Sequence, residues 1–264
     1  MSNVERIPVQ RYEQEELMLN KEAFAKECLI HISVNNQRVT TLLASPDDLL
    51  DLAIGHLAVE HAFRPSNSNI NHRIVEGKNE YSVDLMVKTS QQFASRQTIV
   101  TSSCGACDQE NLDHLVKRTP SVDQQTLPFS IQTIIETLHE LRQQQPGFQE
   151  TGGMHAAGLY LGPDERPIVC EDIGRHNAVD KAIGRSILRA DKNKPMALLL
   201  SGRCGWDIVS KAAHMNIPVV ASIGAASSLA VETARASNMT LISFAKPDKA
   251  VVIGPVEGRF QRNH

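Results

Sequence analysis

The pattern of apolar and polar residues predicts strands and one helix in the first part of the chain. Residues 27–43 alternate polar and apolar side chains around an Asn-Asn-Gln turn, which predicts a β-hairpin. Residues 70–87 show the same pattern and predict a second hairpin. Between them, residues 49–63 carry apolar side chains at helical spacing, and Ser45 stands where an N-cap is expected. This region therefore predicts a small α+β unit.

The pattern changes in the second half, where helices and short apolar strands alternate. Residues 129–142 predict an amphipathic helix. Strands are then expected at 155–161, 167–172, 196–200, 217–223, 240–244 and 251–254, and helices at 177–188, 207–215 and 228–238. Such alternation is typical of βαβ units, so we expect an α/β fold built on a three-layer mixed sheet.

These patterns divide the chain into three parts. Residues 1–26 are polar and predict a flexible N-terminal arm. Residues 27–125 predict the smaller N-terminal α+β subdomain, which ends in a loop that carries two cysteines. Residues 126–264 predict the larger α/β domain, and a chain of 264 residues is long enough for two such units.

Composition excludes several broad classes of protein. The net charge is −3, so no basic field indicates a nucleic-acid partner. Neither a signal-peptide pattern at the N-terminus nor an apolar run long enough to span a bilayer is present in the sequence, so we expect a soluble, cytoplasmic protein without a membrane partner. The 5 cysteines are an odd number in a long chain, which favours thiols that are buried or used in chemistry over a disulfide framework.

Cys104 and Cys107 form the most informative motif, Cys-Gly-Ala-Cys. The motif lies between a predicted strand at 98–102 and a predicted helix at 108–117. A cysteine at a helix N-terminus is favoured as the thiolate, which is the form that attacks sulfur or carbon or binds metal. The alternative is that both residues are simply small and buried. Cys170 and Cys204 are expected to be buried rather than nucleophilic.

Loops with small and basic residues follow three predicted strands. Ligands bind at the carboxyl ends of strands in open α/β sheets, and small residues let the backbone approach a ligand. The loops are Ser201, Gly202 and Arg203, then residues 224–228, and then Phe244, Ala245, Lys246, Pro247, Asp248 and Lys249. Together they suit a phosphorylated ligand such as a nucleotide, although each one alone could be an ordinary connection.

Residues 171–181 are rich in charge and lie at a predicted strand-to-helix turn. Arg175 and His176 could orient a ligand or act as acid and base, and Asp172 could cap the helix. The alternative is a purely structural network of charges. His155 follows two glycines at the start of a predicted strand and is a further candidate.

A metal site is not expected. A zinc nucleoside deaminase needs a His-x-Glu motif followed by Pro-Cys-x-x-Cys. Here His155 is followed by two alanines, Ser103 stands before Cys104, and the cysteines precede the histidine. A structural zinc site would need a second close pair of ligands, and the sequence shows none.

Five motifs together resemble those of the FdhD family, the formate dehydrogenase accessory sulfurtransferases. They occur in the family's order between about residues 29 and 254. The motifs are Cys104–Cys107, residues 151–157, residues 172–181, Ser201–Arg203 and residues 228–232. Two positions depart from the family, since Asp108 and Asp248 stand where glycine is common.

The resemblance implies a function. Members of the family accept sulfur from a cysteine desulfurase as a persulfide, carried here by Cys104 with Cys107 as its partner. They pass it to the molybdenum (or tungsten) bis-guanine-dinucleotide cofactor, a bound substrate, before that cofactor enters formate dehydrogenase. The family's cofactor-contacting loop matches residues 244–249. The resemblance also implies a homodimer, and a main domain like the cytidine deaminase fold without its zinc.

Two other functions remain open from the residues alone. The same cysteine pair could serve a thiol–disulfide oxidoreductase, although no thioredoxin-like pattern surrounds it. The protein could also be a cofactor chaperone in which the cysteines have no chemical role.

Overall fold

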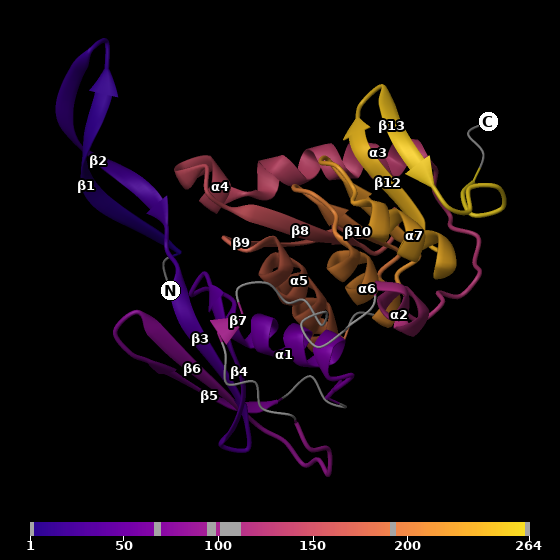
Figure 1. Ribbon diagram of the computed structural model, residues 1–264, viewed down its shortest axis with the longest axis horizontal. Helices are drawn as coiled ribbons and strands as arrows, with labels where there is room; N and C mark the ends of the chain where they lie inside the picture. Colours follow the sequence, from indigo (N-terminus) through magenta and orange to yellow (C-terminus); the bar gives the residue numbers. More distant parts are fainter. Residues whose placement is uncertain (1–2, 66–69, 94–98, 101–111, 191–193, 262–264) are drawn as a thin grey trace.

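The computed structural model describes residues 3–65, 70–93, 99–100, 112–190 and 194–261. These residues form a two-stranded sheet, a five-stranded sheet and a six-stranded sheet, arranged in chain order (Figure 1). None of their helices is both long enough and apolar enough to cross a lipid bilayer.

The N-terminal residues form a long β-hairpin within the segment 1–26, for which the sequence predicted a flexible arm and no strands; the flexibility of this arm stays a prediction. Strands β1 (Val4–Glu13) and β2 (Glu16–Ala25) pair antiparallel along their full length. The hairpin projects away from the rest of the molecule in Figure 1. Because most of its side chains are exposed on both faces, no alternation of buried and polar positions marks it in the sequence.

The five-stranded sheet confirms both hairpins predicted for the first part of the chain. Its order is β5-β6-β3-β4-β7. The first hairpin pairs β3 with β4 and the second pairs β5 with β6, while β3 lies parallel to β6. The strands are β3 (Cys28–Val34), β4 (Gln37–Ala44), β5 (Asn71–Glu76), β6 (Glu80–Met86) and β7 (Ile99–Val100).

Helix α1 (Leu49–Glu60) confirms the helix predicted at 49–63, but its start differs from the expectation. The N-cap residue is Asp48, in a left-handed conformation with φ of 51°, and its side chain makes no capping bond. Ser45, the expected N-cap, is buried, and its Oγ accepts a hydrogen bond from the Ile173 backbone N–H at 3.1 Å. The predicted cap is therefore wrong, because this serine bonds to a distant segment instead.

The six-stranded sheet has the order β13-β12-β11-β10-β8-β9. Strands β10, β11 and β12 are parallel, whereas β8, β9 and β13 each run antiparallel to the neighbour nearer the centre. The sheet is therefore mixed. Its strands are β8 (His155–Tyr160), β9 (Ile168–Asp172), β10 (Ala197–Leu200), β11 (Val219–Ser222), β12 (Thr240–Lys246) and β13 (Lys249–Ile253).

Helices cover both faces of this sheet, which confirms the three-layer arrangement (Figure 1). Alternate residues of each strand enter different cores: Leu198 and Leu200 pack on one face, and Ala197 and Leu199 on the other. The first face is covered by α5 (Arg175–Arg189), α6 (Trp206–His214) and α7 (Ser228–Ala236), with α2 (Leu112–Arg118) beside α7. The second is covered by α3 (Ile131–Glu140), which continues into the 3-10 turn Leu141–Gln144 and then the unexpected short helix α4 (Pro146–Thr151).

Helices α1 and α5 join the two larger sheets by a close crossing. A Cβ atom placed on Gly55 would lie 1.8 Å from the Asp180 carbonyl oxygen. One placed on Gly184 would lie 1.9 Å from the Asp51 carbonyl oxygen. The two backbones therefore touch, and only glycine fits at either position.

The likeness to the cytidine deaminase fold and the boundary at residue 125 stay predictions.

Candidate functional site

Segments from several elements meet at one edge of the six-stranded sheet. The carboxyl ends of the parallel strands β10, β11 and β12 lie there, as the sequence predicts. Because β8 runs antiparallel to β10, its first residue lies at the same edge, where His155 pairs with Asp172 at the end of β9. The edge therefore brings together the candidate loops and the charged turn between β9 and α5.

The turn after β10 is held tightly to its neighbours. Ser201 Oγ accepts a hydrogen bond from the Ala156 backbone N–H at 2.8 Å. Gly202 accepts one from the Gly224 N–H at 3.1 Å, and a Cβ atom on Gly224 would lie 2.8 Å from the Gly202 oxygen. A Cβ atom on Gly202 would also lie 3.1 Å from His155 Nδ1. Small residues in these loops thus serve close backbone packing as well as any ligand.

A cavity of about 280 Å³ opens beside this turn. We call it the arginine cavity; it is lined by Arg175, Arg203, Cys204, Gly205, Ala225, Ala226 and Ser227. Gly205 and Ser227 are the N-cap residues of α6 and α7, so two helix N-termini meet here. Backbone N–H groups at helix starts and two guanidinium groups both favour an anion. The cavity has the chemistry of a phosphate or pyrophosphate site.

His176 takes a different position from its neighbour Arg175. Its side chain is buried, and its Nε2 pairs with Asp207 Oδ2 in the first turn of α6. Burial alone would raise the pKa of Asp207, but the hydrogen bond and charge of His176 outweigh it and lower that pKa. Of the two candidates, Arg175 lines the arginine cavity, while His176 pairs with Asp207 at the start of α6.

The rest of the charged turn ties the site to the N-terminal sheet. Asp172 is fully buried and accepts hydrogen bonds from the Ser45 N–H at 3.0 Å and the Gly174 N–H at 2.8 Å. Lys181 Nζ lies 2.8 Å from Asp172 Oδ2 and 2.7 Å from Asp47 Oδ1. Burial alone would lower the pKa of Lys181, but these two carboxylates outweigh it and raise that pKa. This network supports the structural alternative for much of residues 171–181.

Residues 244–249 form a strand end and a tight turn rather than the expected loop. Strand β12 continues through Lys246, which pairs with Lys249 at the start of β13. Phe244 has a left-handed φ of 49°, and its backbone N–H donates to the Gly224 oxygen at 3.0 Å. Ala245 is buried, whereas Lys246, Pro247, Asp248 and Lys249 are exposed. Pairing with β13 extends the strand beyond the point that the sequence pattern suggested.

The cysteines fall into two groups. Cys104 and Cys107 lie outside the described residues. Cys28, Cys170 and Cys204 are free and buried, with at most 2% of each exposed. Burial raises the pKa of all three thiols, to about 12 for Cys170. This confirms the expectation that Cys170 and Cys204 are buried, and it makes all three poor nucleophiles.

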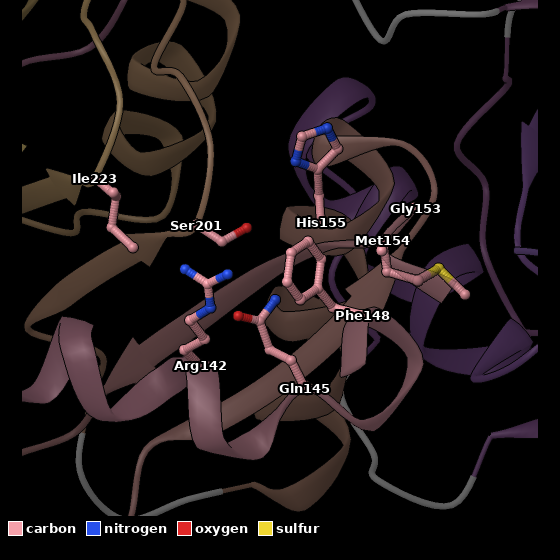
Figure 2. Close-up of a pocket in the computed structure, with 9 residues that line it drawn as sticks. Arg142, Gln145, Phe148, Gly153, Met154, His155, Ser201 and Ile223 are labelled. Atoms are coloured by element: carbon pink, nitrogen blue, oxygen red, sulfur yellow. The ribbon is translucent and has the colours of Figure 1, made fainter. Parts of the chain in front are cut away.

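A second cavity, of about 240 Å³, lies at the same edge (Figure 2). We call it the glutamine cavity; it is lined by Arg142, Gln145, Phe148, Gly152, Gly153, Met154, His155, Ser201 and Ile223. The sequence pointed to His155 and Ser201 but missed Arg142, Gln145 and Phe148. Residues 143–147 show only a helix stop in the sequence, and nothing local indicates that they bend back over the sheet.

Asp48, Asp51 and Cys170 are the one group in the described part of the chain whose ligand atoms could surround a metal, all within 4.8 Å of one another. The guanidinium group of Arg185 already pairs with both aspartates of this group. Its guanidinium lies 2.5 Å from Asp48 Oδ2 and 2.7 Å from Asp51 Oδ2. The local charge is therefore compensated by a side chain, and this group is an ion-pair cluster.

Comparison with known proteins identifies the family. A model of the FdhD/NarQ family matches residues 25–257. The chain belongs to the FdhD/NarQ family. A relative from Anaeromyxobacter dehalogenans, named sulfur carrier protein FdhD, is 34% identical over 253 residues, covering 87% of this chain and 85% of its own. A Streptomyces coelicolor protein of the same name is 34% identical over 229 residues, covering 81% of each chain.

A solved structure shows the same fold as this family member. It is a putative formate dehydrogenase accessory protein from Desulfotalea psychrophila, with a TM-score of 0.75 and 21% sequence identity. The match covers 98% of this chain and 100% of the other. The family match begins at residue 25, so it includes both larger sheets and the two cysteines of the motif, while hairpin β1–β2 lies almost wholly before it.

Proposed function

We propose that this protein is a cytoplasmic sulfur carrier. It takes sulfur from a cysteine desulfurase as a persulfide on Cys104 and transfers it to the molybdenum (or tungsten) bis-guanine-dinucleotide cofactor. The loaded cofactor is then inserted into formate dehydrogenase. Membership of the FdhD/NarQ family and the names of the relatives support the carrier role, and the name of the similar structure supports the link to formate dehydrogenase.

The observation that carries the proposal is the state of the other cysteines. Sulfur transfer needs a thiolate that a partner protein can reach. Cys28, Cys170 and Cys204 are buried and their pKa values are raised, so each fails both requirements. Of the 5 cysteines, this leaves Cys104 and Cys107.

The chemistry balances as two thiol exchanges. First, the Cys104 thiolate attacks the outer sulfur of the desulfurase persulfide, forming a Cys104 persulfide and releasing the desulfurase thiolate. Next, the Cys107 thiolate attacks Sγ of Cys104, forming a disulfide and expelling hydrosulfide toward the metal of the bound substrate. Two molecules of a cellular thiol then reduce the Cys104–Cys107 disulfide, leaving as their own disulfide and restoring both cysteine thiols.

The arginine cavity supports a role in holding the cofactor. A substrate with two pyrophosphate groups needs an anion site, and Arg175 and Arg203 meet two helix N-termini there. Gly202 precedes Arg203 in the chain, and its carbonyl oxygen accepts a hydrogen bond from the Gly224 N–H. Lys246 and Lys249, both exposed, add positive charge at the neighbouring strand end.

Intact mass spectrometry after incubation with a cysteine desulfurase and cysteine tests the carrier step. The wild-type protein should gain about 32 Da per sulfur atom, and reductant should remove the gain. Cys104→Ala should abolish the gain. Cys170→Ala is the matched control, because its thiol is buried, and it should behave as the wild type.

The other functions predict different results. A protein that gains no sulfur but binds GDP, with Cys104→Ala binding equally well, would be a cofactor chaperone. A protein that gains no sulfur but reduces a disulfide substrate would be a thiol–disulfide oxidoreductase. A Cys107→Ala protein that sulfurates the cofactor at the normal rate would exclude the second exchange while leaving the first.

We also propose that the protein works as a homodimer. The exposed apolar side chains of hairpin β1–β2 support an association, since Tyr12, Leu17 and Leu19 are 67%, 64% and 86% exposed. Sedimentation equilibrium of the full chain should give twice the monomer mass.

A further inference from the structure

The glutamine cavity holds a buried donor with no acceptor. Gln145 is only 2% exposed, and its Nε2 has no hydrogen-bond partner among the described residues. A buried amide N–H₂ group without an acceptor is costly, and native proteins rarely leave one unless a water or a ligand fills the gap. Figure 2 shows this amide between Arg142 and Phe148, facing the space that the cavity residues enclose.

The other polar groups around the cavity are also suited to donate. Arg142 is exposed, forms no ion pair with the described carboxylates, and lies with its guanidinium carbon 5.1 Å from the centre of the Phe148 ring. Ser201 Oγ accepts from the Ala156 N–H, so its own hydrogen is available to a ligand. Burial, assisted by the nearby Arg175, lowers the pKa of His155, so its neutral ring offers one further donor.

The remaining side chains that line the cavity are apolar. Phe148 and Ile223 lie on opposite sides in Figure 2, and Met154 is a further apolar lining residue. A volume of about 240 Å³ is below the range of drug-sized pockets, so the cavity suits a small ligand. The single formal positive charge at neutral pH, on Arg142, matches one negative charge.

The geometry points to a binding site for a small organic carboxylate in the glutamine cavity, with Arg142 and Gln145 as the groups that hold its two oxygens. The guanidinium group of Arg142 offers a planar pair of N–H donors that fits a carboxylate. The Gln145 Nε2–H group, which has no acceptor among the described residues, would donate a hydrogen bond to the second carboxylate oxygen. Ser201 and His155, which the sequence analysis places among the candidate cofactor contacts, line this cavity. The site is separate from the arginine cavity and does not depend on the proposed sulfur transfer. The carboxylate could be free in solution or could end a peptide chain.

Calorimetric titration of the full-length protein tests the site. Acetate and benzoate are the free probes, and benzamide is a neutral mimic of benzoate. Benzoate should bind, and benzamide should bind at least about tenfold more weakly, because hydrogen bonds to charged groups are the stronger ones. A short peptide with a free C-terminal carboxylate, beside its amidated form, distinguishes a protein source from a free acid.

Two variants assign the contacts. Arg142→Gln should weaken carboxylate binding by about tenfold or more, and Gln145→Leu should do the same. The matched control is Arg73→Gln, which removes another exposed arginine, on β5. Since Arg142 is exposed, its variant should fold even where a substitution at the buried Gln145 does not; circular dichroism checks both.

Three outcomes would overturn the proposal. The first is that no acetate, benzoate or free-acid peptide binds at concentrations up to about 10 mM. The second is that benzamide binds as well as benzoate, or that Arg142→Gln leaves the affinity unchanged. The third is that guanosine monophosphate, but no carboxylate, binds in a manner that Arg142→Gln abolishes.

Discussion

Replacing Lys181 with methionine should separate the electrostatic role of this lysine from its packing role. The side chain is fully buried between the charged turn and the segment before α1. Its Nζ lies 2.8 Å from Asp172 Oδ2, 2.7 Å from Asp47 Oδ1 and 3.3 Å from the Ser45 carbonyl oxygen. Methionine has a similar length and no charge, so most of the buried volume stays filled.

The expected loss of stability is large. Asp172 has no exposed surface, so removing Lys181 leaves its carboxylate buried without a cation. Removing one partner of a buried ion pair lowers the unfolding free energy by about 3–5 kcal/mol. The backbone N–H groups of Ser45 and Gly174 still donate hydrogen bonds to the Asp172 carboxylate in the variant. Because these bonds stabilise the buried charge, we expect a loss toward the lower end of that range.

Urea unfolding at pH 7, followed by circular dichroism and by fluorescence of the single tryptophan, Trp206, measures this loss. Lys194→Met is the matched control, because Lys194 is exposed, and its unfolding free energy should stay within about 0.5 kcal/mol of the wild type. A loss below about 1 kcal/mol for Lys181→Met would refute the reasoning, because it would mean that the buried carboxylate needs no cation.

The pH dependence of the loss provides an independent check. In Lys181→Met the uncompensated Asp172 should bind a proton more readily in the folded state, so this variant should gain stability relative to the wild type as pH falls toward about 4. At alkaline pH the gap depends instead on the protonation of Lys181 in the wild type. Its folded pKa is raised, so its contribution is complete below about pH 10.5 and is lost only as pH rises through the folded value. The lysine's own contribution should therefore stay constant between about pH 7 and 9, so any change of the gap in this range reports on Asp172, whose pKa burial already raises in the wild type.

Three further predictions concern other parts of the molecule. Gly184→Ala should lower the unfolding free energy by at least about 2 kcal/mol in urea titration, because its Cβ would lie 1.9 Å from the Asp51 oxygen. Cys170 and Cys204 should resist iodoacetamide at about pH 8 in the native protein and react only after unfolding, because burial raises the pKa of both thiols; peptide mass mapping measures this. Arg203→Gln should weaken pyrophosphate binding in calorimetry by about tenfold, through loss of one charged donor in the arginine cavity.

Each of these has a contrasting result. Gly153→Ala is the control for the glycine variant, since its nearest new contact would be 3.4 Å from the Ala25 Cβ, and it should be nearly neutral. Labelling of Cys204 in the folded protein at the rate of a free thiol would show that the burial argument is wrong. Pyrophosphate binding unchanged in Arg203→Gln would remove this residue from the anion site.

Local pattern was enough to predict most of the elements. Period-two and helical spacing are properties of neighbouring residues, so the hairpins at 27–43 and 70–87 and most strands and helices of the α/β part could be predicted. Hairpin β1–β2 could not, because exposure on both faces leaves no period to detect. The start of α1 could not either, because Ser45 bonds to a segment 128 residues away.

The sequence by itself determined where the candidate loops gather, and the tertiary structure decided which of their side chains line a cavity. Carboxyl ends of parallel strands meet at one edge, so loops after β10 and β11 could be assigned to a common site. Arg175 and His176 are adjacent in sequence, yet Arg175 lines a cavity and His176 pairs with Asp207. Gln145 faces the second cavity only because the chain after α3 turns back across the sheet. Such positions depend on contacts between residues far apart in the chain, and a local pattern carries no information about those contacts.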